Sequence, residues 1–247
     1  MRAPDETARR AARIIEAVPD PPGLPPRGEC HVWMHQGHLS SSPGSAASPA
    51  SPEGRSPEDA RRPTPAGTMR LVLDELVRRY LPSADPVVDR TCGRCARRHG
   101  RPVVVVAGLR SALRVSVAHS GGTTVFAFSG SADVGIDVEV VRPGFDWQPM
   151  LDLVYSDAEQ RQTEAVADPA ARRARYYERW VAKEAVLKAM GVGLAGPLNE
   201  VDTTGGRDTT WNGWSMMALP VELPLVGSLA CAETLTGVHM LTLRIQC

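Results

Sequence analysis

The chain has 247 residues, the length of one or two domains, and 43% of them are hydrophobic, which is enough to form a core. Because 28 Lys and Arg balance 28 Asp and Glu, the composition gives no support for non-specific nucleic-acid binding. No apolar run approaches the ~20 residues of a membrane helix, and the first residues lack the apolar core of a signal peptide. With five cysteines and no export signal, we expect a cytoplasmic protein with reduced thiols.

Two segments near the N-terminus are expected to lie outside the folded core. Residues 1–28 end in a run of prolines and are predicted to be a flexible tail. In residues 40–66, 13 of 27 residues are Ser or Pro, and such a composition buries too little apolar surface to offset its ordering entropy. This segment is predicted to be a disordered insert. A short apolar piece, residues 30–34, lies between the two.

The rest of the chain predicts a mixed α+β fold. Residues 69–80 carry apolar side chains at helical spacing, and residues 155–188 are expected to be helical with Ser156 and Glu159 as a capping box. Alternating or continuous apolar runs separated by glycine-containing turns predict strands. These runs are residues 103–106, 113–118, 124–128, 134–140, 229–233 and 239–245.

Two carboxylates lie on one face of the strand predicted at residues 134–140. The sequence there is VGIDVEV, so a period of two places Asp137 and Glu139 with Gly135, opposite the branched apolar residues. Like charges at such positions repel each other unless solvent or a cation intervenes. Hard oxygen ligands with this spacing suit Mg²⁺ bound together with phosphate oxygens. A solvated strand face remains the other interpretation.

Two further segments carry chemically useful side chains. Helical spacing puts Trp180, Glu184 and Lys188 on one stripe, although a surface Glu–Lys pair worth ~0.3–0.5 kcal/mol is the simpler interpretation. His119 ends a predicted strand just before a Ser-Gly-Gly turn, where an imidazole and backbone N–H groups can meet an anion. A hydrogen-bonded turn histidine is the simpler alternative.

In order and spacing, AHSGG, GIDVE and WVAKEAVLK resemble the motifs of the Sfp-type 4′-phosphopantetheinyl transferase superfamily. Members typically show a Ser-His-Ser-Gly turn, a G-[IV]-D-[IV]-E strand and a W-[ST]-x-K-E-[AS]-x-x-K helix. The resemblance covers about residues 69–193. It includes Gly-Arg-Pro at 100–102 and Tyr-Ser-x-x-Glu at 155–159.

The chain departs from the family pattern at a few positions. Ala118 stands where a serine often precedes the histidine, and Val181 and Ala182 replace small hydroxyl residues. Arg101 replaces a lysine, which keeps the charge but presents it as a planar fork. The Ser/Pro-rich insert falls where the family has folded chain. None of these changes removes a candidate metal ligand.

The resemblance implies a fold, a reaction and residue roles. The fold is two pseudo-symmetric α/β subdomains with the active site at their interface, here residues 29–130 and 131–247, the second holding the metal and catalytic residues. The reaction transfers the phosphopantetheine arm of coenzyme A to a serine of an apo acyl or peptidyl carrier protein, releasing adenosine 3′,5′-bisphosphate. The enzyme would be monomeric and would need Mg²⁺ or Mn²⁺, which neutralises the pyrophosphate while a base takes the serine proton.

The implied residue roles fall into three groups. Asp137, Glu139 and Glu184 are the expected metal ligands, Glu184 and Lys188 the expected catalytic residues, and His119, Arg70, Arg101, Lys183 and Lys188 the expected coenzyme A contacts. Lys183 is expected to meet either a phosphate or a carboxylate. Fatty acid, polyketide and peptide synthase carriers all remain open as substrates.

A cysteine motif suggests other functions. Cys92-Gly-Arg-Cys95 with His99 has the spacing of a zinc half-site, for which Cys30 or His31 is a candidate fourth ligand; free thiols in a loop are the alternative. Zinc there would support a phosphate- or nucleic-acid-binding module built on the neighbouring arginines, against which the zero net charge argues. A catalytically degenerate homologue that binds carrier protein or coenzyme A is the other alternative.

Overall fold

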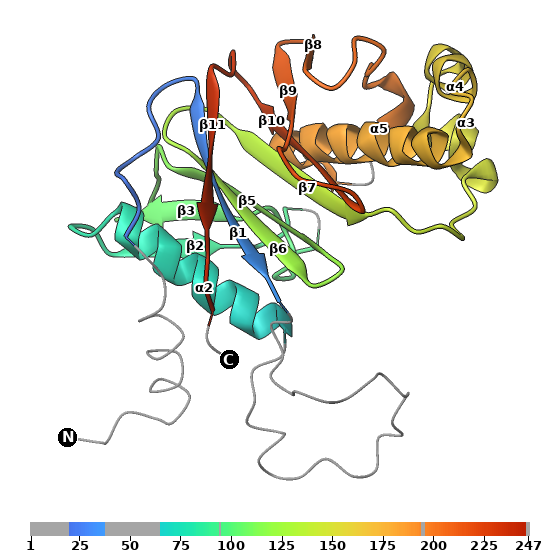
Figure 1. Ribbon diagram of the computed structural model, residues 1–247. Coiled ribbons are helices and arrows are strands. Elements are labelled where there is room, and N and C mark those ends of the chain that lie inside the picture. Colours follow the sequence, from blue (N-terminus) through green and yellow to red (C-terminus); the bar gives the residue numbers. More distant parts are fainter. Residues whose placement is uncertain (1–19, 38–64, 94, 194–195, 246–247) are drawn as a thin grey trace.

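The computed structural model describes residues 20–37, 65–93, 95–193 and 196–245, and it confirms a mixed α+β fold (Figure 1). The strands are β1 (Glu29–Gln36), β2 (Pro86–Asp89), β3 (Val103–Val106), β4 (Leu109–Arg110), β5 (Arg114–Ser120), β6 (Thr123–Ser129), β7 (Val134–Val140), β8 (Thr209–Trp211), β9 (Trp214–Ala218), β10 (Leu225–Cys231) and β11 (Gly237–Thr242). The helices are α2 (Pro65–Tyr80), α3 (Leu151–Val154), α4 (Asp157–Glu164) and α5 (Pro169–Met190), with short 3-10 turns η2 (Gln148–Met150) and η4 (Leu198–Glu200).

Two four-stranded sheets meet along a seam between β5 and β7. Their strand orders are β11-β1-β6-β5 and β7-β10-β9-β8, and a small third sheet has the order β2-β3-β4. At the seam, serine hydroxyls of β5 accept hydrogen bonds from backbone N–H groups of β7. Ser116 Oγ bonds the Ile136 amide and Ser120 Oγ bonds the Val140 amide, each at 3.1 Å. Side chains therefore join the two edge strands.

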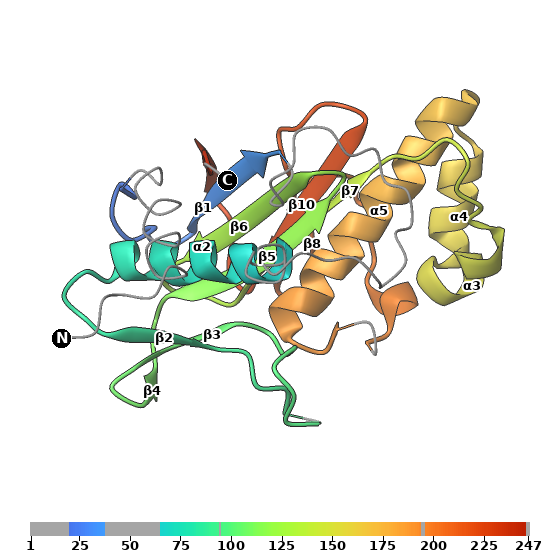
Figure 2. The ribbon, with the colours of Figure 1, turned by 90° about the horizontal axis from the view of Figure 1, so that it is seen from below.

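The hydrophobic core is divided by the sheets. Helix α2 packs on one face of the first sheet, where Trp33, Leu76 and Phe126 are buried (Figure 2). The opposite face of that sheet shares a cluster with the second sheet, including Val32 and Ile136. Helix α5 lies along β7 and β10 on the remaining face of the second sheet (Figure 1).

Gly135 brings α5 unusually close to β7. A Cβ atom on this residue would lie 1.9 Å from the Ala185 carbonyl oxygen and 2.5 Å from the Ala189 amide nitrogen. The β7 alternation predicted from the sequence is confirmed, because Val134, Ile136 and Val138 all enter the core between the two sheets. The Gly135 face therefore meets α5.

The helical stretch predicted at residues 155–188 is two helices rather than one. The Ser156–Glu159 capping box is confirmed at the start of α4. A new helix begins after Asp168, whose side chain accepts the Ala171 amide while Pro169 occupies the first turn. A proline fits there because its missing N–H would have no partner, whereas inside one continuous helix it would remove a hydrogen bond.

The predicted domain division differs from the structure at its two ends. Strand β11, in the predicted C-terminal subdomain, pairs in parallel with β1 and therefore belongs to the first sheet. The predicted tail lies outside the described residues up to residue 19, but residues 20–28 are attached to the fold: the Gly28 amide donates to Glu233 Oε1 at 3.0 Å, and Arg79 binds Asp20 at 3.0 Å. Most of the predicted insert, residues 40–64, also lies outside the described residues. No helix in the described ranges is long and apolar enough to cross a membrane.

Candidate active site

Three of the predicted site residues meet between β7 and the C-terminal half of α5. Lys188 Nζ donates to Asp137 Oδ1 at 2.6 Å. Glu184, one turn earlier on α5, lies close enough to interact electrostatically with both Asp137 and Lys188. Asp137 and Glu184 are only 6% and 7% exposed, so two acids and one base share a nearly dry space. The simpler interpretation of Glu184 and Lys188 as a surface pair is wrong.

This space holds more negative charge than its one lysine balances. Burial raises the pKa of Asp137 to about 6; the Lys188 ammonium opposes that rise and the Glu139 carboxylate adds to it. Burial, followed by the charges of Asp137 and Glu139, raises the pKa of Glu184 to about 7, again against Lys188. Both carboxyls therefore resist ionisation in the metal-free protein, as expected for acids that share a site.

Two oxygen atoms in this space have no hydrogen-bond partner. Among the described residues, the few buried side-chain polar atoms without one include Asp137 Oδ2 and Glu184 Oε1. A buried carboxylate oxygen without a donor is costly, and each such atom needs a physical reason. A divalent cation, which prefers carboxylate oxygens, supplies that reason. The chemistry of these donors therefore suits Mg²⁺ or Mn²⁺, although the three carboxylates would have to move closer together to hold one ion.

Glu139, the third predicted ligand, is oriented by Ser120. The hydroxyl of Ser120 donates to Glu139 Oε2 at 2.7 Å while it accepts the Val140 amide. The sequence pattern places Ser120 in a turn, and the second serine of the family's Ser-His-Ser-Gly pattern is the signal that points to a role at the site. His119 is exposed, and strand alternation directs it to the opposite side of β5 from Ser120.

Lys183 lies in the core rather than at the candidate site. Its side chain is fully buried, and its Nζ is 2.8 Å from Glu159 Oε2 and donates to the carbonyl oxygens of Leu198 and Val201. Glu159 also accepts the amide and the hydroxyl of Thr203. Of the two partners expected for Lys183, the structure shows the carboxylate. A coenzyme A contact would need an ammonium that reaches the surface.

The two predicted arginines have different surroundings. Arg101 donates to the Ala189 carbonyl at the end of α5 and, at 2.7 Å, to Asp133 Oδ1, so it spans the two halves of the chain beside the turn that carries Lys188. Its Nε is buried without a partner among the described residues. Arg70 is exposed on α2 and lies 3.9 Å from Asp74 of its own helix, so the contact observed for it is with α2 rather than with the carboxylates.

The predicted cysteine cluster forms, but without its proposed fourth ligand. The ligand atoms of Cys92, Cys95 and His99 all lie within 4.8 Å of one another, and among the described residues this is the one such trio. The carboxylate oxygens of Asp137, Glu139 and Glu184 do not all lie within 4.8 Å of one another. Cys30 is fully buried and bonds Cys231, while His31 Nδ1 bonds the Tyr80 hydroxyl at 2.9 Å. Both side chains are committed elsewhere, so the expectation that one of them completes the trio is wrong.

Comparison with known proteins supports the predicted resemblance. Residues 133–212 match the family model of the 4′-phosphopantetheinyl transferase superfamily. The chain is 32% identical to the putative 4′-phosphopantetheinyl transferase slr0495 of Synechocystis, over 54% of this chain and 52% of that protein. It is 35% identical to 4′-phosphopantetheinyl transferase AcpT of Salmonella typhi, over 36% of this chain and 45% of that protein. It is 26% identical to 4′-phosphopantetheinyl transferase HetI of Nostoc, over 54% of this chain and 57% of that protein. The chain spans about half the length of these relatives.

Proposed function

Because residues 133–212 belong to the 4′-phosphopantetheinyl transferase superfamily, we propose that this protein transfers the phosphopantetheine arm of coenzyme A to a serine of an apo carrier protein. The relatives named above carry the name of this reaction. The main structural support is the pair of buried, unpartnered oxygens, Asp137 Oδ2 and Glu184 Oε1, beside Lys188. A cation bound between these side chains would give both oxygens a partner.

The proposed metal site consists of Asp137, Glu139 and Glu184. Bound there, Mg²⁺ or Mn²⁺ would supply positive charge to the pyrophosphate oxygens of coenzyme A. Asp137 and Glu184 offer the unpartnered oxygens, while Ser120 fixes the direction of Glu139. Binding is coupled to proton release, because Asp137 and Glu184 must lose their protons to become ligands.

The same residues suit the proton transfers of the reaction. Glu184 is suited to take the proton of the carrier serine, because one of its buried carboxylate oxygens has no donor among the described residues; the raised pKa of about 7 belongs to the metal-free protein, and a bound cation would lower it. Lys188 lies within 2.6 Å of Asp137, and its partly exposed ammonium is suited to neutralise or protonate the leaving bisphosphate. His119, Arg70 and Arg101 remain the proposed phosphate contacts, whereas Lys183 supports the helix from inside.

The proposed site lies where the two sheets join. We propose, as the family resemblance implies, that the two halves are pseudo-symmetric and that the protein acts as a monomer with its site at their interface. The seam is the supporting feature. Ser116 and Ser120 fasten β5 to β7 there, and β7 carries two of the proposed ligands.

Mass spectrometry of a carrier protein tests the proposal. Apo acyl or peptidyl carrier protein is incubated with coenzyme A, Mg²⁺ and either the parent or the Asp137→Asn variant. We expect the parent to add the mass of phosphopantetheine and the variant to add none, whereas Glu164→Gln, at an exposed position of α4, should behave like the parent. Binding of coenzyme A without transfer to any carrier would establish the degenerate homologue instead.

A further inference from the structure

We infer that Cys92, Cys95 and His99 form a zinc site that clamps the loop between β2 and β3. The site is separate from the carboxylates and takes a different metal. Two thiolates and an imidazole are the ligand set that zinc prefers, whereas Mg²⁺ prefers oxygen ligands. The inference rests on the side chains of this loop alone and does not depend on the transfer reaction.

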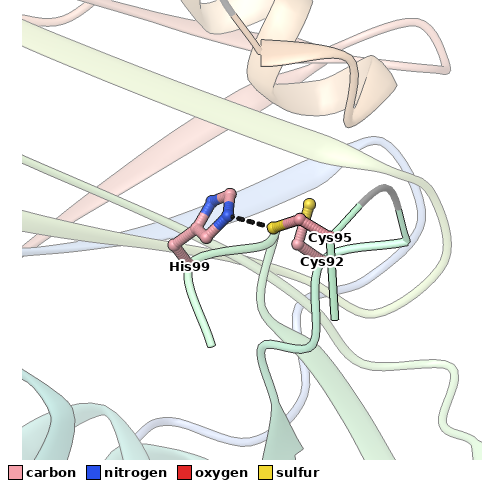
Figure 3. Close-up of side chains that lie close together, drawn as sticks. All are labelled: Cys92, Cys95 and His99. Carbon is pink, nitrogen blue, oxygen red and sulfur yellow. Dashed lines mark hydrogen bonds between the residues drawn. The ribbon is translucent and has the colours of Figure 1, made fainter. Parts of the chain in front are cut away.

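The backbone of the loop gathers the three side chains on one side (Figure 3). The Cys92 amide donates to the Arg97 carbonyl, and the Ala96 amide donates back to the Cys92 carbonyl, each at 2.8 Å. Ala96 has a φ of 56°, which turns the chain back after Cys95. His99 follows and points its ring at Cys95, whose Sγ lies 2.9 Å from His99 Nε2. The fold therefore brings the side chains together, which spacing in the sequence alone does not ensure.

The spacing of the ligand atoms is close to that of a tetrahedral zinc site. With Zn–S near 2.3 Å and Zn–N near 2.0–2.1 Å, neighbouring ligand atoms stand roughly 3.5–3.8 Å apart. The three atoms here lie within 4.8 Å of one another, with the Cys95–His99 pair at 2.9 Å. Movements of about 1 Å by partly or fully exposed side chains would give that geometry, and the exposure leaves the ion a path of entry. Water would fill the fourth position.

The position of the loop gives the clamp a physical consequence. Its ends are already tied by a 2.7 Å hydrogen bond from the Gly100 amide to the Arg90 carbonyl. The next residue, Arg101, holds Asp133 and the Ala189 carbonyl at the end of α5. Zinc binding would therefore stiffen the loop just before Arg101, the residue that contacts Asp133 and α5. Because Cys92 and Cys95 must lose their protons to bind, uptake of zinc should release protons.

Metal titration of the full chain tests the site without any measurement of turnover. The protein, prepared without a metal-affinity tag and kept reduced, is titrated with Co²⁺ and then Zn²⁺. We expect a single tight Co²⁺ to give the near-ultraviolet sulfur charge-transfer band and the intense visible bands of tetrahedral cobalt, and zinc to displace it. Loss of a residue that only hydrogen-bonds to a metal ligand weakens metal binding about 10–100-fold. Because Cys95→Ser and His99→Asn each remove a ligand itself, each should weaken zinc binding by at least about 100-fold. His239→Asn removes another exposed imidazole and should change nothing.

Trypsin cleavage after the exposed Arg97 or Arg98 provides a second readout. With free zinc at ~100 times its dissociation constant, the open population of the loop should fall about 100-fold, and cleavage with it. Cys95→Ser should lose that protection. The inference is overturned if the reduced parent binds no zinc, if the cobalt spectrum lacks the sulfur band, or if Cys95→Ser and His99→Asn bind zinc as the parent does.

Discussion

Replacing Glu184 with glutamine should stabilise the metal-free protein at alkaline pH. The pKa of Glu184 rises from its ordinary 4.5 to about 7, chiefly through burial and then through the charges of Asp137 and Glu139. At ~1.4 kcal/mol for each pKa unit, ionising Glu184 in the folded protein costs about 3 kcal/mol. The residue is only 7% exposed, so solvent does little to reduce this cost.

The sign of the effect follows from proton binding. The folded protein holds the Glu184 proton more tightly than the unfolded chain does, so the cost is absent below about pH 4.5 and complete above about pH 7. Stability of the parent therefore falls as pH rises through this window. Glutamine removes the charge but adds an amide N–H₂ without a partner, which subtracts about 1 kcal/mol. The net gain is about 2 kcal/mol at pH 8, or ~4–8 °C in Tm for a chain of this size.

Thermal and urea unfolding with EDTA at pH 5 and pH 8 measures this effect. Glu184→Gln should unfold later than the parent at pH 8 and show little gain at pH 5, whereas Glu164→Gln, at an exposed position, should match the parent at both. Adding Mg²⁺ should stabilise the parent more than the variant. If Glu184→Gln is less stable than the parent at pH 8, Glu184 is not a buried acid held at a cost, and the argument for the metal site fails with it.

The same variant separates two roles of Glu184, and three other changes test the surrounding structure. If Glu184 is mainly the base, turnover of Glu184→Gln should fall by a factor of about 10²–10⁴, while its affinity for Mg²⁺ and coenzyme A stays near that of the parent. If Glu184 is mainly a ligand, the affinity for Mg²⁺ and coenzyme A should fall together with turnover, and extra Mg²⁺ should restore part of the turnover. Gly135→Ala should lower the free energy of unfolding in urea by about 3 kcal/mol or more, since the new Cβ would lie 1.9 Å from a carbonyl oxygen of α5. An unchanged free energy of unfolding would show that α5 moves freely. Ser120→Ala should weaken Mg²⁺ binding about 10–100-fold, as measured by calorimetry, because it removes the hydrogen bond that orients Glu139. Ser116→Ala removes only a hydrogen bond between β5 and β7 and should leave Mg²⁺ binding unchanged. Equal effects of the two changes would refute the role of Ser120 in orienting Glu139. Lys183→Met should lower stability by at most about 3–5 kcal/mol, because it removes the nearer cationic partner of the buried Glu159 carboxylate and leaves Arg179 at 3.7 Å; a loss of coenzyme A affinity without a loss of stability would contradict the buried placement.

The sequence predicted the strand that carries the proposed metal ligands because its pattern is local. A period of two in β7 is enough to place Asp137 and Glu139 on one face, and the structure puts the apolar residues on the other. The helix stripe likewise predicted that Glu184 and Lys188 share a face. Pairing these two faces required the family resemblance, since no local pattern states which helix covers which strand.

Other features depend on contacts between distant residues and were not predicted. The Ser120–Glu139 hydrogen bond joins two strands that lie in separate sheets, and the parallel pairing of β11 with β1 brings residues from opposite ends of the chain together. The burial of Lys183 depends on Glu159 from another helix. The sequence left both a phosphate and a carboxylate open as partners of Lys183, and it did not predict burial, because a fully buried lysine is rare unless it is paired.

Lys183 and Glu184 are neighbours in the sequence, yet the fold treats their charges in opposite ways. Consecutive residues point about 100° apart on a helix, so one side chain enters the α4–α5 interior and the other meets β7. Lys183 is matched there by a carboxylate and two carbonyl oxygens, which holds α5 in place. Glu184 keeps an oxygen without a partner among the residues that the structure describes, and its pKa is raised to about 7. The contacts of Lys183 oppose a shift of α5 that would relieve Glu184, and the cation that we propose at this site would restore both charge balance and stability.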